Sequence, residues 1–149
     1  MSLNLYVHNL QGLWLNTNRL TGPLPPAWAG MSRLQGLWLS WNELTGTLPA
    51  AWSGLSVLRV LSVNHTGLNG TLPAAWSAMR QLQLLDVSFD ALTGPLPAAW
   101  GNMTQLRELW PFYNGGLCGP VPPGALSRAV QVGVRSGSGT GSGSGSGKG

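Results

Sequence analysis

The chain has 149 residues, of which 43% are hydrophobic and only 8% are charged, far below the roughly one quarter that is typical of soluble domains. We therefore expect its surface to be kept soluble by neutral polar groups, by attached sugar or by burial against partners. The net charge of +4 comes from basic residues that are spread along the chain without forming a run. Nucleic-acid binding needs a clustered basic face, so no nucleic-acid partner is predicted. The single cysteine, Cys118, excludes an intrachain disulfide and a cysteine-rich zinc site.

Residues 1–9 are interpreted as a truncated repeat, because Leu5 to Asn9 look like a strand but no full return coil precedes the next one. Met1 to Asn9 also lack the basic region and apolar run of a signal peptide. This absence predicts either an intracellular protein or a mature or trimmed chain. No stretch of the sequence reaches the length of a membrane span, so none is predicted.

Residues 10–122 contain five repeats with a period of 24 residues. The period is set by tryptophans at Trp28, Trp52, Trp76 and Trp100, and by leucines at Leu13, Leu37, Leu61, Leu85 and Leu109. Each unit follows the pattern L-x-x-L-x-L-x-x-N-x-L-T-G-x-L-P-x-x-W. One such coil cannot bury its own apolar face, but stacked neighbours can. The repeat therefore predicts a solenoid in which the tryptophans are core residues.

The residue types in each part of the repeat predict its secondary structure. Leu37 and Leu39 alternate around Trp38, which is the period of a short strand with one buried face. Asn42 follows where a side-chain amide can satisfy backbone groups at the turn. Thr66 and Asp90 replace this asparagine in the middle units, so the ladder there is expected to be imperfect.

The C-terminal part departs from the pattern. Pro111 replaces a strand leucine and Gly115-Gly116 adds a residue to the fifth unit. Residues 123–135, in which Val130, Val132 and Val134 alternate, are interpreted as a degenerate cap. Residues 136–149 form a Gly/Ser tract that is typical of a flexible linker or tail.

The segments Leu20 to Pro25, Leu44 to Pro49 and Leu92 to Pro97 resemble the plant-type subclass of leucine-rich repeats. The L-P-x-x-W variant and the ending Gly116 to Pro120 are similar to secreted green-algal repeat proteins, and L-P-x-x-W is also similar to trypanosomatid surface antigens. The resemblance implies an α/β-type solenoid, a right-handed coil with a short parallel concave sheet and an irregular or 3-10 convex side. It also implies an extracellular, glycosylated protein that binds proteins, peptides or glycans.

In such a coil the residues between the strand leucines project from the concave sheet and form columns across the repeats. Seven large aromatics and one histidine fall in these positions against very few charges, and we predict that they form the ligand-binding face: Trp14, Trp38, Trp41, His65, Phe89, Trp110, Phe112 and Tyr113. Contiguous exposed apolar patches commonly mark interaction sites. Ordinary strand propensity is the alternative explanation for any one of these aromatics.

Three N-glycosylation sequons occur, at Asn64, Asn69 and Asn102. Together with the low charge they favour the secretory route and an extracellular or cell-surface location. Asn69 and Asn102 are predicted in return loops with room for a glycan, whereas Asn64 is predicted on the concave face, where a glycan would obstruct binding.

Catalysis has little support in the sequence. A triad can be drawn among Ser62, His65 and Asp86, but no nucleophile elbow surrounds Ser62 and the face is open to water. Two histidines and one thiol leave no metal cluster, and no phosphate-binding glycine motif is present. We therefore predict a non-enzymatic module without cofactors or metal. Its expected partner is a protein or a glycan, and the alternative is a structural subunit that assembles with copies of itself into a surface, matrix or fibre assembly.

Overall fold

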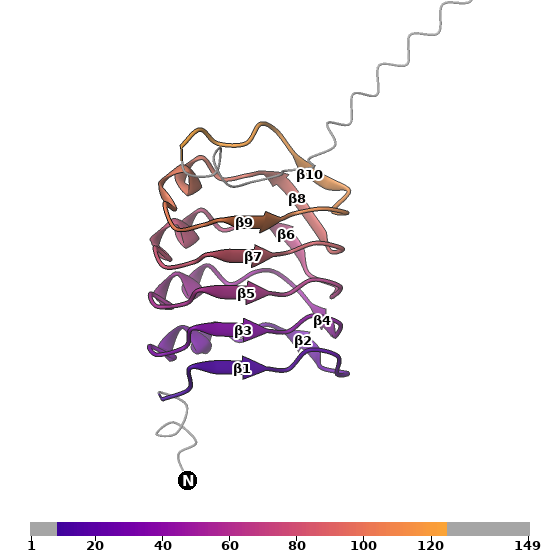
Figure 1. Cartoon of the computed structure of the whole chain (residues 1–149). Coiled ribbons are helices and arrows are strands. Elements are labelled where there is room, and N and C mark those ends of the chain that lie inside the picture. The colour runs from indigo at the N-terminus through magenta and orange to yellow at the C-terminus, as the bar shows by residue number, and fades with distance from the viewer. Residues whose placement is uncertain (1–8, 125–149) are drawn as a thin grey trace, which may run out of the picture.

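The computed structural model describes residues 9–124, and all structural statements below refer to this range. The chain forms a stack of similar coils that runs from the N-terminal to the C-terminal end (Figure 1). The truncated repeat, the degenerate cap and the Gly/Ser tail predicted from the sequence fall largely on residues 1–8 and 125–149, which lie outside the described residues.

One strand from each coil enters a five-stranded parallel sheet with the order β1-β3-β5-β7-β9. These strands are β1 (Gly12–Trp14), β3 (Gly36–Trp38), β5 (Val60–Ser62), β7 (Leu84–Asp86) and β9 (Glu108–Trp110). Leu13 pairs with Leu37, Leu37 with Leu61, and the series continues to Leu109. The predicted strands and their register are therefore confirmed.

A second, irregular layer of strands follows the turn in each coil. Its members are β2 (Thr21–Pro23), β4 (Glu43–Thr45), β6 (Asn69–Thr71), β8 (Ala91–Pro95) and β10 (Gly116–Cys118). They pair as β2-β4 and as β6-β8-β10. Asn69, which was predicted in a loop, thus begins a strand, although its side chain is exposed. The remaining side of the coil is made of 3-10 helices, as predicted: η1 (Pro26–Gly30), η2 (Ala50–Gly54), η3 (Ala74–Ala78) and η4 (Ala98–Asn102).

A ladder of tryptophans fills the core next to these 3-10 helices. Trp52, Trp76 and Trp100 are fully buried, and Trp28 at the first coil is half-buried. Neighbouring rings are stacked with centroids 6.0–6.4 Å apart. The buried indole N–H groups do not stay unpaired, because Trp76 donates to the carbonyl oxygen of Pro49 at 3.0 Å and the other two bond their preceding coils in the same way. The core role predicted for this ladder is confirmed.

Asparagines tie the turns of adjacent coils together. Asn42 accepts a hydrogen bond from the Leu20 N–H and donates to the carbonyl oxygens of Leu15 and Leu39. Asn114 repeats this pattern with Leu92 and Val87 at the last coil. These bonds satisfy backbone groups that the turn would otherwise bury without a partner.

Candidate functional site

Four rings form a continuous stack at the turn that follows the concave strands. Trp41, His65, Phe89 and Tyr113 occupy the same position in successive coils, and their centroids lie 3.8, 4.1 and 4.2 Å apart. Trp41, Phe89 and Tyr113 are 57%, 42% and 74% exposed. We call these four residues the turn stack. Because the ring faces contact one another, the stack presents mainly ring edges to the solvent.

The backbone of the turn stack lies in the left-handed region. Its four residues have φ between 50° and 59°, and Thr17 takes the same conformation in the first coil. This conformation costs an L-residue roughly 1–2 kcal/mol, and glycine or asparagine adopts it more readily. Four large rings at such positions indicate that the turn geometry is imposed by the solenoid and that ring stacking partly offsets its cost.

A second aromatic group lies on the concave sheet at its N-terminal end. The Trp14 and Trp38 rings are parallel, with centroids 5.0 Å apart, and Trp14 is 67% exposed. Each indole bends back over a glycine of its own strand, because a Cβ on Gly12 or Gly36 would lie 2.3 Å from the ring carbon Cη2. The two glycines thus make room for the pair. The sequence carries this signal, since a glycine stands two residues before each tryptophan on the same strand face.

The middle of the concave face carries polar side chains between the groups of aromatics. The Asp86 carboxylate accepts hydrogen bonds from the Asn64 amide and from the Ser88 hydroxyl and N–H, and it is buried. Ser40 and Ser62 share a 2.7 Å hydrogen bond. The predicted site residues therefore divide into the Trp14–Trp38 pair, the turn stack, and a separate end at Trp110 (45% exposed) with half-buried Phe112.

A hollow of about 730 Å³ lies beside the N-terminal end of the turn stack. Trp41 and His65 line it together with Arg19 and Glu43. It combines an aromatic wall with one cation and one carboxylate, which are groups that can orient a polar ligand.

The family model described as "Leucine Rich Repeat" matches residues 9–31 and 33–55. The ectodomain of the plant receptor kinase GASSHO1/SCHENGEN3 from Arabidopsis thaliana, in complex with CASPARIAN STRIP INTEGRITY FACTOR 2, is 37% identical over 81% of this chain, with a TM-score of 0.75.

The chain belongs to the plant-type leucine-rich-repeat family.

Two further structures support this leucine-rich-repeat assignment. PEPR1-AtPEP1 is 31% identical over 74% of the chain with a TM-score of 0.71, and the plant peptide hormone receptor RGFR1 in complex with RGF2 is 26% identical over 78% with a TM-score of 0.72. The chain spans only 14%, 15% and 22% of the lengths of GASSHO1, PEPR1 and RGFR1, respectively. No curated sequence matches the leucine-rich-repeat chain.

In the described coils, the three residues of the triad drawn from the sequence each contact other partners. His65 is held between Trp41 and Phe89, while Ser62 bonds Ser40 and Asp86 bonds Asn64 and Ser88. Between residues 9 and 124 no hydrogen bond links Ser62, His65 and Asp86, and no three His, Cys, Asp or Glu residues lie together as metal ligands would. Over the same range, none of the helices has the length and hydropathy needed to cross a lipid bilayer.

The imperfect ladder that the sequence predicts at Asp90 is present, whereas the buried structural role of the Asp86 side chain was missed by reasoning from the sequence. Burial raises the pKa of Asp90 to about 6, against the lowering effect of its hydrogen bonds from Thr66. The Asp90 Oδ2 atom and the Asn64 Oδ1 atom are buried without a hydrogen-bond partner.

Proposed function

We propose that this leucine-rich-repeat module is an extracellular interaction module that binds a segment of a partner protein through its exposed aromatics. The turn stack is the observation that carries the proposal. Exposed aromatic side chains contribute to interfaces through buried area and stacking, and a few such residues dominate binding energies.

The layout of the aromatics suits an extended chain segment. The turn stack runs across four coils that lie about 4.8 Å apart, so a bound segment parallel to the solenoid axis can meet one ring edge per coil. The Trp14–Trp38 pair and the hollow with Arg19 and Glu43 lie at the N-terminal end of this path. Similar structures support this ligand class, since the GASSHO1/SCHENGEN3 ectodomain is in complex with CASPARIAN STRIP INTEGRITY FACTOR 2 and the plant peptide hormone receptor RGFR1 is in complex with RGF2.

A glycan is the other ligand that exposed aromatics accommodate, because the apolar faces of sugar rings stack on them. Few ring faces are free in the turn stack, because most of them contact the neighbouring ring. The geometry therefore favours a protein segment with apolar side chains that insert between or against the ring edges.

The test replaces Trp38 and Trp41 together by serine. Parent and double variant are screened against the same displayed peptide library and the same glycan array, with Leu20→Ser as a control because Leu20 is 36% exposed but outside both aromatic groups. We expect the parent and the control to enrich common peptide sequences that the double variant does not enrich. Equal enrichment by all three proteins would refute the proposal. Glycan binding by the parent and the control, but not by the double variant, would show that the ligand is a glycan and not a protein segment.

Self-association is the second candidate function, as a structural subunit of a surface or fibre assembly. It is favoured by the first described coil, where Leu13, Leu15 and Trp28 are only half-buried while their equivalents in the next coil are fully buried. An end of a solenoid that is not covered by a polar cap can dock another copy, and head-to-tail contacts that do not close produce filaments. Light scattering after size exclusion tests this candidate: a monodisperse monomer at high concentration contradicts it.

A further inference from the structure

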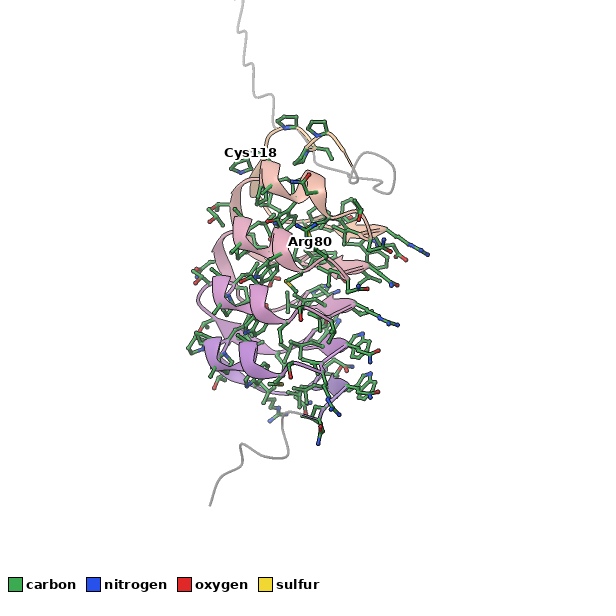
Figure 2. All side chains as sticks on the ribbon, turned by 90° about the vertical axis from the view of Figure 1, so that its left-hand side faces the viewer. Arg80 and Cys118 are labelled. Atoms are coloured by element: carbon green, nitrogen blue, oxygen red, sulfur yellow. The ribbon has the colours of Figure 1, made fainter. Side chains whose placement is uncertain are left out.

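The solenoid gathers most of its arginines on one edge, although they are dispersed in the sequence. Arg33, Arg59, Arg80 and Arg107 occupy the segments that lead from each 3-10 helix into the next concave strand, one in each of four successive coils. In Figure 2 this edge faces the viewer, with Arg80 near its centre. We call these four residues the arginine edge. It lies on the side of the concave sheet opposite to the turn stack, since one precedes the strands and the other follows them.

Backbone hydrogen bonds hold this edge in register. The N–H of Arg59 donates to the Gln35 carbonyl oxygen at 2.7 Å, and the N–H of Gln83 donates to that of Arg59 at 2.8 Å. The same column begins at Gln11 and ends at Arg107. Glutamine and arginine therefore share this column at the spacing of the coils, about 4.8 Å, while Arg33 and Arg80 lie two and three residues before its glutamines Gln35 and Gln83.

The charges on this edge are not neutralised within the described part of the chain. All four arginines are exposed, and no ion pair forms between them and a carboxylate of residues 9–124. Asp86 is occupied by Asn64 and Ser88, and Glu43 lies on β4 beyond the turn. Glu108, which follows Arg107 on β9, is the one carboxylate beside the edge.

A hollow between the first coils of this edge is lined mainly by polar residues. Its volume is about 520 Å³, and Arg33 and Arg59 line it together with Gln11, Gln35 and Ser32. Guanidinium groups bind carboxylates through paired, charge-assisted hydrogen bonds, and amides and hydroxyls donate to and accept from hydroxyl groups. Val57 is the sole hydrophobic residue in the lining, so a ring on which a nucleic-acid base could stack is missing from it.

We propose that the arginine edge binds a linear acidic polysaccharide, with its carboxylate groups on the arginines and its hydroxyl groups on the interleaved glutamine and serine side chains. This site is separate from the aromatic surface of the proposed function, so the protein can hold a polysaccharide on one edge and a protein ligand on the other. The proposal does not depend on the identity of the protein ligand.

The test uses three probes with one backbone: dextran, carboxymethyl-dextran and dextran sulfate, together with a single-stranded oligonucleotide of matched charge. Binding of the full chain is measured by calorimetry at low and physiological salt. We expect carboxymethyl-dextran to bind, dextran not to bind, and the affinity to fall as salt rises because the contacts are ionic. Oligonucleotide binding equal to or tighter than that of carboxymethyl-dextran would overturn the assignment to a polysaccharide, and tighter binding of dextran sulfate would assign the site to sulfated rather than carboxylated polymers and so overturn the carboxylate assignment.

Variants distinguish binding at the arginine edge from nonspecific attraction to the net positive charge of the protein. Arg59→Gln with Arg107→Gln should weaken carboxymethyl-dextran binding by about ten-fold or more, as expected for the loss of two charge-assisted contacts. Arg19→Gln is the matched control, because Arg19 lines the hollow beside Trp41 at the opposite edge. The double change Arg59→Lys with Arg107→Lys keeps the charge and should retain part of the affinity. The arginine edge would be refuted as the binding site if Arg19→Gln lost as much affinity for carboxymethyl-dextran per removed charge as the double Gln variant. Unchanged affinity in the double Gln variant would also refute it. Circular dichroism melts verify that all variants fold, and peptide binding through the aromatics should be unaffected.

Discussion

Asp90 accepts two hydrogen bonds from Thr66, one from the hydroxyl at 2.7 Å and one from the backbone N–H at 2.9 Å, both on its Oδ1 atom. Its Oδ2 atom is buried and has no partner. At the same place in the coil, the Asn114 amide nitrogen donates to the carbonyl oxygens of Val87 and Pro111. The Asp90 carboxylate thus accepts hydrogen bonds, as the asparagine side chain does. It has no N–H group with which to donate to the backbone carbonyl oxygens.

This arrangement predicts a stability that falls with rising pH. Burial raises the pKa of Asp90 from 3.8 to about 6, so the folded chain binds the proton more tightly than the unfolded chain between these values. The contribution is therefore fully present below pH 3.8 and is lost as the pH rises through about 6. Solvent reaches part of this carboxyl, so we expect a loss of about 1 kcal/mol rather than the full value of the shift. Urea unfolding at a series of pH values measures it.

Asp90→Asn is the corresponding variant. An amide can donate where Oδ2 now has no partner, so this change should stabilise the protein above pH 7 by about 1 kcal/mol and flatten its stability between pH 4 and 7. If the variant is less stable than the parent at pH 8, the raised pKa of Asp90 does not describe the protein.

The tryptophan ladder predicts position-dependent costs of truncation. Trp76→Ala removes a fully buried ring with stacked neighbours on both sides and should cost on the order of 3–5 kcal/mol. Trp76→Phe keeps most of the ring but leaves the Pro49 carbonyl oxygen without its donor, so about 1–2 kcal/mol is expected. Trp28→Ala, at the half-buried end of the ladder, should cost clearly less than Trp76→Ala in denaturant unfolding. Equal costs at both ends would contradict a stacked core.

The turn stack predicts that asparagine is better tolerated than alanine at Phe89. Both changes remove the ring, but asparagine favours the left-handed backbone that Phe89 adopts with φ of 56°. Phe89→Asn should therefore be more stable than Phe89→Ala by up to about 1 kcal/mol, as judged by thermal melts. The reverse order would show that the positive φ at this turn is not retained.

The Trp14–Trp38 pair can be displaced without touching the core. Gly36→Ala places a methyl group where the Trp38 ring now lies, so the ring must rotate and the parallel pair must separate. We expect the exciton signal of the coupled indoles in circular dichroism to weaken. Gly30→Ala is the matched control, since nothing lies within 4 Å of a Cβ at that position. A signal that survives unchanged in Gly36→Ala, or one that weakens equally in Gly30→Ala, would disprove the assignment.

The sequons should differ in occupancy if the native host secretes the chain. Asn69 and Asn102 are exposed, whereas the Asn64 amide donates to the Asp86 carboxylate and its Oδ1 atom is buried. We expect glycans at Asn69 and Asn102 and none at Asn64. Intact mass before and after amidase treatment, together with Asn→Gln changes at each sequon, measures this. A native protein without any glycan would contradict the secretory route.

The 24-residue period by itself determined the coil, the five paired strands and the buried ladder of Trp52, Trp76 and Trp100. The reason is that stacking identical coils aligns equivalent positions, so periodicity in sequence becomes a column in space. The columns of aromatics were therefore predictable. Their conformation was not, because the left-handed φ of Trp41 and Phe89 is set by the hydrogen-bonded turn between neighbouring coils and opposes local preference.

Only the tertiary structure decided what depends on neighbours in different coils. Asn64 and Asp86 stand 22 residues apart, and their hydrogen bond turns the middle of the concave face into a polar, buried junction. Arg33 and Arg59 look isolated in the sequence, yet they line one hollow because the coil brings the segment before each strand to a common edge. Repeats predict which positions align, but the side chains that replace the consensus at those positions find their partners only once the coils are stacked.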